Sequence, residues 1–143
     1  MKLSICVFSG VVVWAASAYQ GGALRSPSTP SPIRVVATPY PRLAHLADAQ
    51  GDVHLAVTIA SGGAVSKVDV TSGASLLRDS ARTMVSQWIF SPCVEAQPCQ
   101  AQVILHYVLE AGMCADSDCP STFQFDLPST VTIRANHRPA IVN

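Results

Sequence analysis

Cysteine is the residue type with the clearest chemistry in this sequence. Four cysteines, Cys93, Cys99, Cys114 and Cys119, lie in its second half, and Cys6 lies near the N-terminus. An even set in an exported chain indicates two disulfides, with three pairings open. We favour Cys93–Cys99 with Cys114–Cys119, because each pair brackets a turn containing proline or aspartate. Zinc binding is the weaker alternative, since the C-x5-C and C-x4-C spacings differ from the C-x2-C pairs of common structural sites.

Other side chains that could do chemistry are scattered along the chain. They are His54, His106, Ser80, Asp69, Asp79 and Glu110. None of them stands in a glycine-framed nucleophile turn or at a metal-ligand spacing. Both histidines fall on predicted strands, where a surface or cross-strand histidine is the common situation and a two-histidine metal site the rare one. We therefore predict no catalytic residue, no metal and no cofactor.

Length and charge exclude several classes of function. The chain has 143 residues, the size of one ordinary domain with short additions. Nine basic and nine acidic residues give a formal net charge of zero, and no basic patch stands out. Nucleic acid binding and polybasic contact with a membrane surface therefore lack an electrostatic basis.

The first eighteen residues have the pattern of a signal peptide. Lys2 is followed by the apolar stretch Ile5–Ala16, and Ala16-Ser17-Ala18 supplies the small residues of a cleavage site before Tyr19. The alternative is a short, uncleaved membrane anchor, but a spanning helix needs about 20 apolar residues. Membrane attachment is expected only if residues 1–18 are retained.

Composition divides the rest of the chain into a linker, a domain and a tail. Residues 19–38 are rich in proline, serine and glycine, which predicts an extended spacer. Residues 39–135 carry the periodic patterns of a folded domain, and residues 136–143 are expected to be a loose tail.

Two helices and a hairpin are predicted within the domain. A short helix over Pro41–Ala49 would use Leu43, Ala44, Leu46 and Ala47 as its apolar side. Alternation over Val53–Ile59 and Ala64–Thr71, with a glycine turn between them, predicts two paired strands. An apolar stripe then marks a second helix from Ser75 to Gln87 or Trp88; it contains Leu77, Ala81, Met84, Val85 and Trp88.

The C-terminal part is predicted to be extended. Ala101–Leu109 alternates but is fairly apolar on both faces, as in a strand within a sheet. Two further extended runs are expected over Thr122–Leu127 and Thr130–Ala135. The expected fold class is thus α+β: two helices on a small antiparallel sheet, in the order helix-strand-strand-helix-strand, with extra C-terminal strands.

The segment 39–109 carries an ordered set of landmarks: Tyr40-Pro41, Gly51-Asp52-Val53, Gly63-Ala64-Val65, Val68 and Val70 before Ser72-Gly73, and Leu77, Ala81 and Val85 leading to Trp88-x-Phe90-x-Pro92. With these landmarks in this order, the segment resembles the C-terminal domain of the TonB energy transducer. The resemblance covers about 70 residues and implies a periplasmic, non-catalytic domain.

The resemblance also implies a binding mode and a class of partner. Domains of this family bind a segment of an outer-membrane receptor by strand addition, and they transmit work from an inner-membrane motor. The receiving edge would be the strand Gln102–Leu109, that is Gln102, Val103, Ile104, Leu105, His106, Tyr107 and the two residues after them. An open edge can also pair with a second copy of the chain to form a homodimer.

Three features separate this sequence from a full transducer. The N-terminus has a cleavable pattern, the spacer is only about twenty residues long, and Thr122–Ala135 could pair with the edge that a receptor would use. A stand-alone secreted or periplasmic domain, with a structural or interaction role and no motor, is therefore the alternative function.

Overall fold

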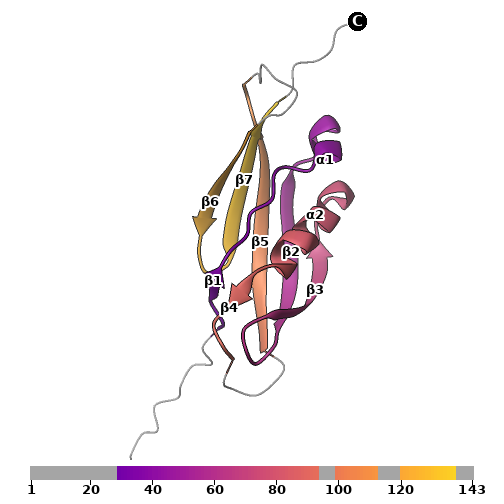
Figure 1. Ribbon diagram of the computed structural model, residues 1–143. Helices are drawn as coiled ribbons and strands as arrows, with labels where there is room; N and C mark the ends of the chain where they lie inside the picture. Colours follow the sequence, from indigo (N-terminus) through magenta and orange to yellow (C-terminus); the bar gives the residue numbers. More distant parts are fainter. Residues whose placement is uncertain (1–28, 94–98, 113–119, 138–143) are drawn as a thin grey trace, which may run out of the picture.

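A computed structural model describes residues 29–93, 99–112 and 120–137, and Figure 1 shows an α+β fold. The α+β class and the two helices of the sequence prediction are confirmed. Two sheets are present in the described residues, a ribbon of β1 and β4 and a five-stranded sheet in the order β3-β2-β5-β7-β6. The elements are β1 (Pro32–Arg34), α1 (Arg42–Leu46), β2 (Gly51–Ile59), β3 (Val65–Ser72), α2 (Ser75–Ser86), β4 (Ile89–Phe90), β5 (Cys99–Glu110), β6 (Ser121–Asp126) and β7 (Thr130–Asn136).

The sheet is mixed, which corrects the expectation of a purely antiparallel one. β2 pairs antiparallel with both β3 and β5, and β6 pairs antiparallel with β7. β7, however, runs parallel to β5. The cause is the order of the C-terminal hairpin: its second strand lies beside β5, and its first strand lies outside.

The β2–β3 hairpin follows the predicted alternation. Its inward residues Val53, Leu55, Val57 and Ile59 are fully buried. Gly63, in the turn, has a φ of +95°, and a Cβ there would lie 2.1 Å from the Phe90 carbonyl oxygen. The Phe90 amide donates to the Gly63 carbonyl (2.8 Å), so this turn can approach β4 only where the residue lacks a side chain.

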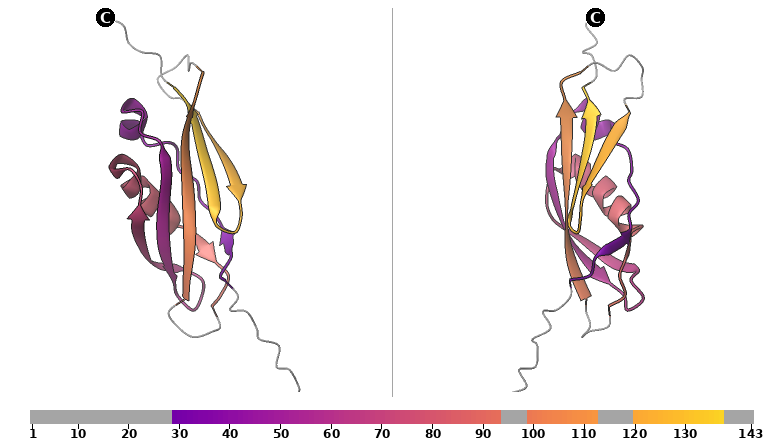
Figure 2. Two further views of the ribbon diagram at one scale, coloured as in Figure 1. Left: turned by 180° about the vertical axis from the view of Figure 1, so that it is seen from behind. Right: turned by 90° about the vertical axis from the view of Figure 1, so that its left-hand side faces the viewer.

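The second helix covers the sheet with the predicted stripe. Leu77, Ala81, Met84 and Val85 of α2 are fully buried, and so is Trp88 just beyond its end. Figure 2 shows that α2, α1 and the segment before α1 all lie on one side of the sheet. The period of the stripe therefore places the core between α2 and the inward face of the β2–β5 pair.

The apolar face predicted for the first helix is confirmed at Ala44 and is wrong at its other residues. Leu43 and Leu46 are 69% and 58% exposed, whereas Ala44 and His45 are buried. The helix is one short turn, so its face is set by the contacts at its two ends. The His45 Nε2–H donates to the Asn136 carbonyl oxygen at 2.6 Å, which turns the histidine toward β7.

Part of the predicted linker belongs to the fold. Residues 29–40, here called the N-terminal strap, run lengthwise on the helix side of the sheet (Figure 1). β1 pairs with β4, and the Trp88 indole N–H donates to the Val36 carbonyl at 2.9 Å. Pro30 and Pro32 are buried. Prolines suit this role because an extended strap needs few backbone donors of its own.

The predictions for the chain ends are partly outside the described residues. Residues 1–28, which include the predicted signal peptide, lie outside them, as do 138–143. The sequence predicts a loose tail from residue 136, but the fold extends through His137. Asn136 ends β7, and the His137 ring lies 3.1 Å from an Asp48 carboxylate oxygen. Neither helix of the described part is long and apolar enough to cross a membrane.

Candidate partner-binding edge

The predicted receiving strand, β5, lies in the middle of the sheet. Its odd-numbered residues Val103, Leu105 and Tyr107 are buried beneath the helices and the strap. Its even-numbered residues Gln102 and His106 lie on the opposite face. Ile104 and Val108 share that second face and are half-buried, which explains why both faces of the run are partly apolar in sequence.

Both hydrogen-bonding sides of β5 are occupied over Ile104–Tyr107, so most of the predicted edge is not open. β2 pairs with β5 from Cys99 to Tyr107, and β7 pairs with it from Ile104 to Glu110. The Ile104 amide donates to the Ser129 carbonyl at 2.7 Å, where this second ladder begins. The expectation of an open receiving edge is therefore corrected over Ile104–Leu109, and the expectation that the C-terminal run could pair there is confirmed.

β7 is held in this place by buried side chains. Val131, Ile133 and Ala135 are exposed by only 1%, 0% and 3%, so they complete the core beside β5. At the open end of the hairpin, the Tyr40 amide donates to the Ser121 hydroxyl at 2.9 Å. The hairpin is thus bound both to the sheet and to the strap.

Two tyrosines mark the centre of this packing. Tyr40 and Tyr107 meet edge to face, with ring centroids 5.4 Å apart. Burial raises the pKa of each from 10.0 to about 12; the neighbouring Tyr107 and Asp48 add to the shift in the pKa of Tyr40. The Tyr40 hydroxyl donates to the Ala49 carbonyl at 2.5 Å. Both phenols are therefore neutral structural groups at ordinary pH.

The free edge beside β7 is β6. It pairs with β7 from Ser121 to Asp126 and with no other strand among the described residues. Phe123 packs partly against the core, while Phe125 is 44% exposed and Leu127, in the turn, is 53% exposed. Asp126 carries the single charge of the strand. Within the described part of the chain, this edge combines apolar side chains with backbone groups that no second strand pairs.

The opposite edge of the sheet, β3, has a different character. Its pairing with β2 is irregular at two places. Lys67 and Asp69 stand on it as an exposed ion pair, with Nζ and a carboxylate oxygen 2.9 Å apart. Charges and bulges are the features by which proteins keep an edge strand from pairing. β3 is thus a protected edge, and β6 is not.

The side chains considered for catalysis are dispersed in the structure. His106 contacts Asp52 on the helix-free face, and His54 lies on the same face, across from Ile104. A shallow hollow of about 190 Å³ lies there, with His54 and Gln102 in its lining.

The acidic candidates instead form three separate ion pairs, and the candidate hydroxyl, that of Ser80, belongs to none of them. The pairs are Asp69 with Lys67, Asp79 with Arg82, and Glu110 with Arg134. Ser80 lies on α2, near the Tyr107 hydroxyl. Within the described ranges, no group of three or more potential metal ligands occurs.

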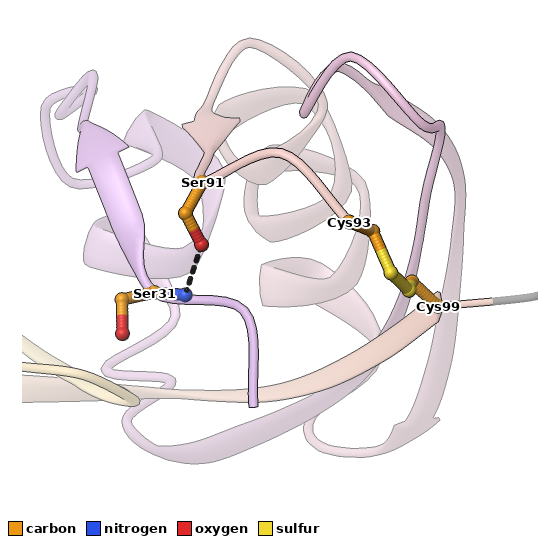
Figure 3. The surroundings of a disulfide bond; sticks show 4 residues. All are labelled: Ser31, Ser91, Cys93 and Cys99. Carbon is orange, nitrogen blue, oxygen red and sulfur yellow. Dashed lines mark hydrogen bonds between the residues drawn. A yellow bond between two sulfur atoms is a disulfide. The ribbon is translucent and has the colours of Figure 1, made fainter. Parts of the chain in front are cut away.

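One pair of the predicted disulfides lies within the described residues. Figure 3 shows Cys93 joined to Cys99, with their Cα atoms 6.3 Å apart. The bond ties the end of the β4 segment to the start of β5. Nearby, the Ser31 amide donates to the Ser91 hydroxyl (3.1 Å) and the Ser91 amide to the Ser31 carbonyl (2.8 Å). Cys114, Cys119 and Cys6 lie outside the described residues.

Sequence patterns identified the strands of the C-terminal hairpin but not the free edge. The alternation of Phe123 and Phe125 predicts a strand with one apolar face, but the same pattern suits either hairpin strand beside β5. The inward face of β6 carries Ser121, Phe123 and Phe125, and that of β7 carries Val131, Ile133 and Ala135, so no clear difference in local pattern tells which of the two strands lies at the edge.

Comparison with known proteins agrees with this architecture. A family model described as "Gram-negative bacterial TonB protein C-terminal" matches residues 36–109, more than half of the chain. The match begins within the strap and ends in β5, so the C-terminal hairpin lies beyond it. A comparison with curated proteins gives no match.

Proposed function

The chain belongs to the TonB C-terminal family, and we propose that it binds an extended segment of a partner protein by strand addition at β6. Family membership supports a non-catalytic protein-interaction role in the periplasm or cell envelope. The observation that carries the proposal is that, in the part of the chain that the structure describes, β6 pairs on one side only, next to the exposed ring of Phe125.

Strand addition at β5 would require the removal of β7. That step would expose Val131, Ile133 and Ala135, which are almost completely buried. Burial of a valine or isoleucine side chain contributes about 1.5–3 kcal/mol. Displacement would therefore cost several kcal/mol before any new strand was bound, whereas β6 accepts a strand without loss of existing pairs.

The edge also indicates the chemistry of the segment. Phe123 and Phe125 share one face of β6, and the opposite face carries Thr122 and Gln124. A segment with apolar residues at alternate positions would cover the two rings. A periplasmic segment of an outer-membrane receptor is the partner that the family supports.

Peptides from such receptor segments, encoded in the same genome, test the proposal. Added to the isotopically labelled full chain, a binding peptide should shift and protect amides of β6 and leave those of β3 unchanged. A peptide methylated at alternate backbone nitrogens is the matched control and should not bind, because strand addition uses backbone hydrogen bonds.

Two outcomes would contradict the proposal. One is binding that survives backbone methylation, and the other is a set of shifts confined to β3 or the helices. The variant Phe125→Asp should weaken binding about tenfold or more, since a factor of ten corresponds to about 1.4 kcal/mol. Leu43→Asp, which changes an exposed leucine of α1, should leave binding unchanged.

A second function is favoured by the closure of β5. A stand-alone periplasmic or secreted domain, with no energy-transducing role, has no need for the receiving edge that the family implies. Intact mass and thiol labelling after envelope fractionation separate the two roles. A released product starting at Tyr19 supports the stand-alone domain. A membrane-bound product that retains residues 1–18 supports a coupling protein.

A further inference from the structure

The open side of β6 also limits the direction and the sequence of a segment that binds there. We propose that the bound segment runs antiparallel to β6 and carries, in this order, a basic residue, a large apolar residue, a polar residue and a second apolar residue. This inference rests on the proposed function, because it describes the occupant of the same edge. β6 lies beyond the segment 36–109 that the family model matches, so the pattern belongs to the C-terminal addition of this chain.

The hydrogen bonds of β7 determine which backbone groups of β6 are open. The Ser129 carbonyl accepts from Ile104 of β5, so odd-numbered residues of β7 direct their backbone groups toward β5 and even-numbered ones toward β6. Gln124 lies opposite an even-numbered residue of β7 and therefore exchanges its hydrogen bonds with that strand. The N–H and C=O groups of Phe123 and Phe125 point the other way, where no strand of the described residues pairs with them.

An antiparallel segment can use these four groups with the fewest ordered residues. Two of its residues, opposite Phe123 and Phe125, would each exchange a pair of hydrogen bonds with β6. A parallel segment would need three residues for the same four bonds, because each of its residues bonds to the two neighbours of the residue that it faces. Every additional ordered residue costs conformational entropy, and parallel pairing is also slightly less stable per residue. The antiparallel direction is therefore favoured.

Exposure along the edge distinguishes the two apolar positions of the segment. Phe123 and Phe125 lie opposite the buried Ile133 and Val131, so both rings are on the face that carries the core. Phe123 packs partly against that core, whereas Phe125 is 44% exposed and Leu127, in the turn that follows, is 53% exposed. An antiparallel segment meets Phe125 first. Its first apolar residue would thus cover the larger exposed surface, and we call this residue the anchor.

The opposite, helix-free face selects the polar residues of the segment. The residue before the anchor would lie opposite Asp126, which is the one charged residue of β6. Opposite charges in a cross-strand pair are stabilising and like charges are not, so lysine or arginine is favoured there. The residue after the anchor would face Gln124, whose side-chain amide lies 3.2 Å from the Asp126 carboxylate. A polar side chain suits this position, because the amide has both donors and an acceptor.

A spin label on the bound peptide tests the direction. The probe is the receptor-derived peptide that protects β6 of the full chain most strongly, made with a nitroxide at one end or the other. A label at the N-terminal end of the peptide should broaden the amide signals of Asp126 and Leu127 more than that of Thr122. A label at the C-terminal end should give the opposite order. Reversal of both results would show a parallel segment and overturn the proposal.

Single amide-to-ester substitutions in the same peptide test which backbone groups are used. Each substitution removes one N–H without adding a methyl group. At either apolar position it should weaken binding about fivefold, as expected for one lost hydrogen bond, and at the position between them it should leave binding unchanged. Loss of binding at the middle position, with tolerance at the two apolar ones, is the pattern of a parallel segment and contradicts the proposal.

Side-chain substitutions test the order of the pattern. Alanine at the anchor should weaken binding about tenfold or more, and alanine at the second apolar position should have a smaller effect. Glutamate in place of the basic residue should weaken binding about threefold. In the protein, Phe125→Ala should remove the preference for a large anchor, whereas Leu43→Ala on α1 is the matched control and should retain it. An equal preference in the Phe125→Ala protein would refute the assignment of the anchor.

The failure of this inference can be distinguished from failure of the proposed function. A peptide that protects β6 but gives the reversed label or ester pattern overturns the inference and leaves strand addition intact. If no receptor peptide affects β6, strand addition at this edge is wrong and the inference is wrong with it.

Discussion

Tyr107 of β5 lies beside Ile133 of β7 in a parallel ladder, and both side chains are buried. The TonB C-terminal match ends two residues after this tyrosine. The chain therefore supplies, from outside the matched segment, the strand that closes the edge of the matched domain. This relationship moves the available edge from β5 to β6.

Shortening the side chain of Ile133 tests how firmly β7 is part of the core. Ile133 is fully buried, so Ile133→Ala should lower the free energy of unfolding by about 2–5 kcal/mol, through lost burial and the cavity left behind. Urea denaturation of the two proteins measures the difference.

Thr122→Ala on the exposed face of β6 is the comparison variant and should change the free energy of unfolding by less than about 0.5 kcal/mol. An Ile133→Ala protein as stable as the parent would mean that β7 is only loosely attached to β5.

The Cys93–Cys99 bond should stabilise the junction between the β4 segment and β5. It closes a small loop with a sequence separation of 6, for which the chain-entropy relation gives about 2–3 kcal/mol. The double variant Cys93→Ser, Cys99→Ser should therefore unfold at lower urea concentration. Thiol labelling of the parent should find neither cysteine reactive; labelling of both without a reductant would refute the bond.

Stability should fall as the pH rises from 10 to 12. Burial raises the pKa of Tyr107 from 10.0 to about 12, so the unfolded chain loses this proton before the folded one does. The stabilisation is complete below pH 10 and is lost through the folded pKa, by about 2–3 kcal/mol for this group.

Denaturation at pH 9 and 11 measures this slope, and Tyr107→Phe should make it smaller. An equal slope in the variant would show that Tyr107 does not titrate in this way. Tyr40, whose pKa burial also raises to about 12, should account for part of the remaining slope.

Periodicity predicted the elements of this fold well because each has one strongly apolar face. The stripe ending at Trp88 and the alternation of Val53–Ile59 are examples, and all their inward residues are buried. Periodicity failed for Leu43 and Leu46, because a single helical turn buries too little surface to determine its own orientation. Their neighbour His45 is turned inward by a hydrogen bond to the distant Asn136, which no local pattern contains.

The strap and the free edge could not be read from the sequence for a related reason. Proline and serine around Pro32 indicate an extended chain, but an extended chain can be solvated or packed. The packing here depends on the Trp88 indole, 52 residues away from its acceptor at Val36. Likewise, the two strands of the C-terminal hairpin have similar local patterns. Which of them lies beside β5 depends on contacts between residues that are distant in sequence.

Amide hydrogen exchange along β5 tests the central claim most directly. The amide of Ile104 donates toward the β7 side, so the amides of His106 and Val108 point the same way in this ladder. If β7 closes β5, these three amides should exchange as slowly as those of Leu105 and Tyr107, which face β2. Fast exchange at Ile104, His106 and Val108, with slow exchange at Leu105 and Tyr107, would contradict the account and restore β5 as the receiving edge.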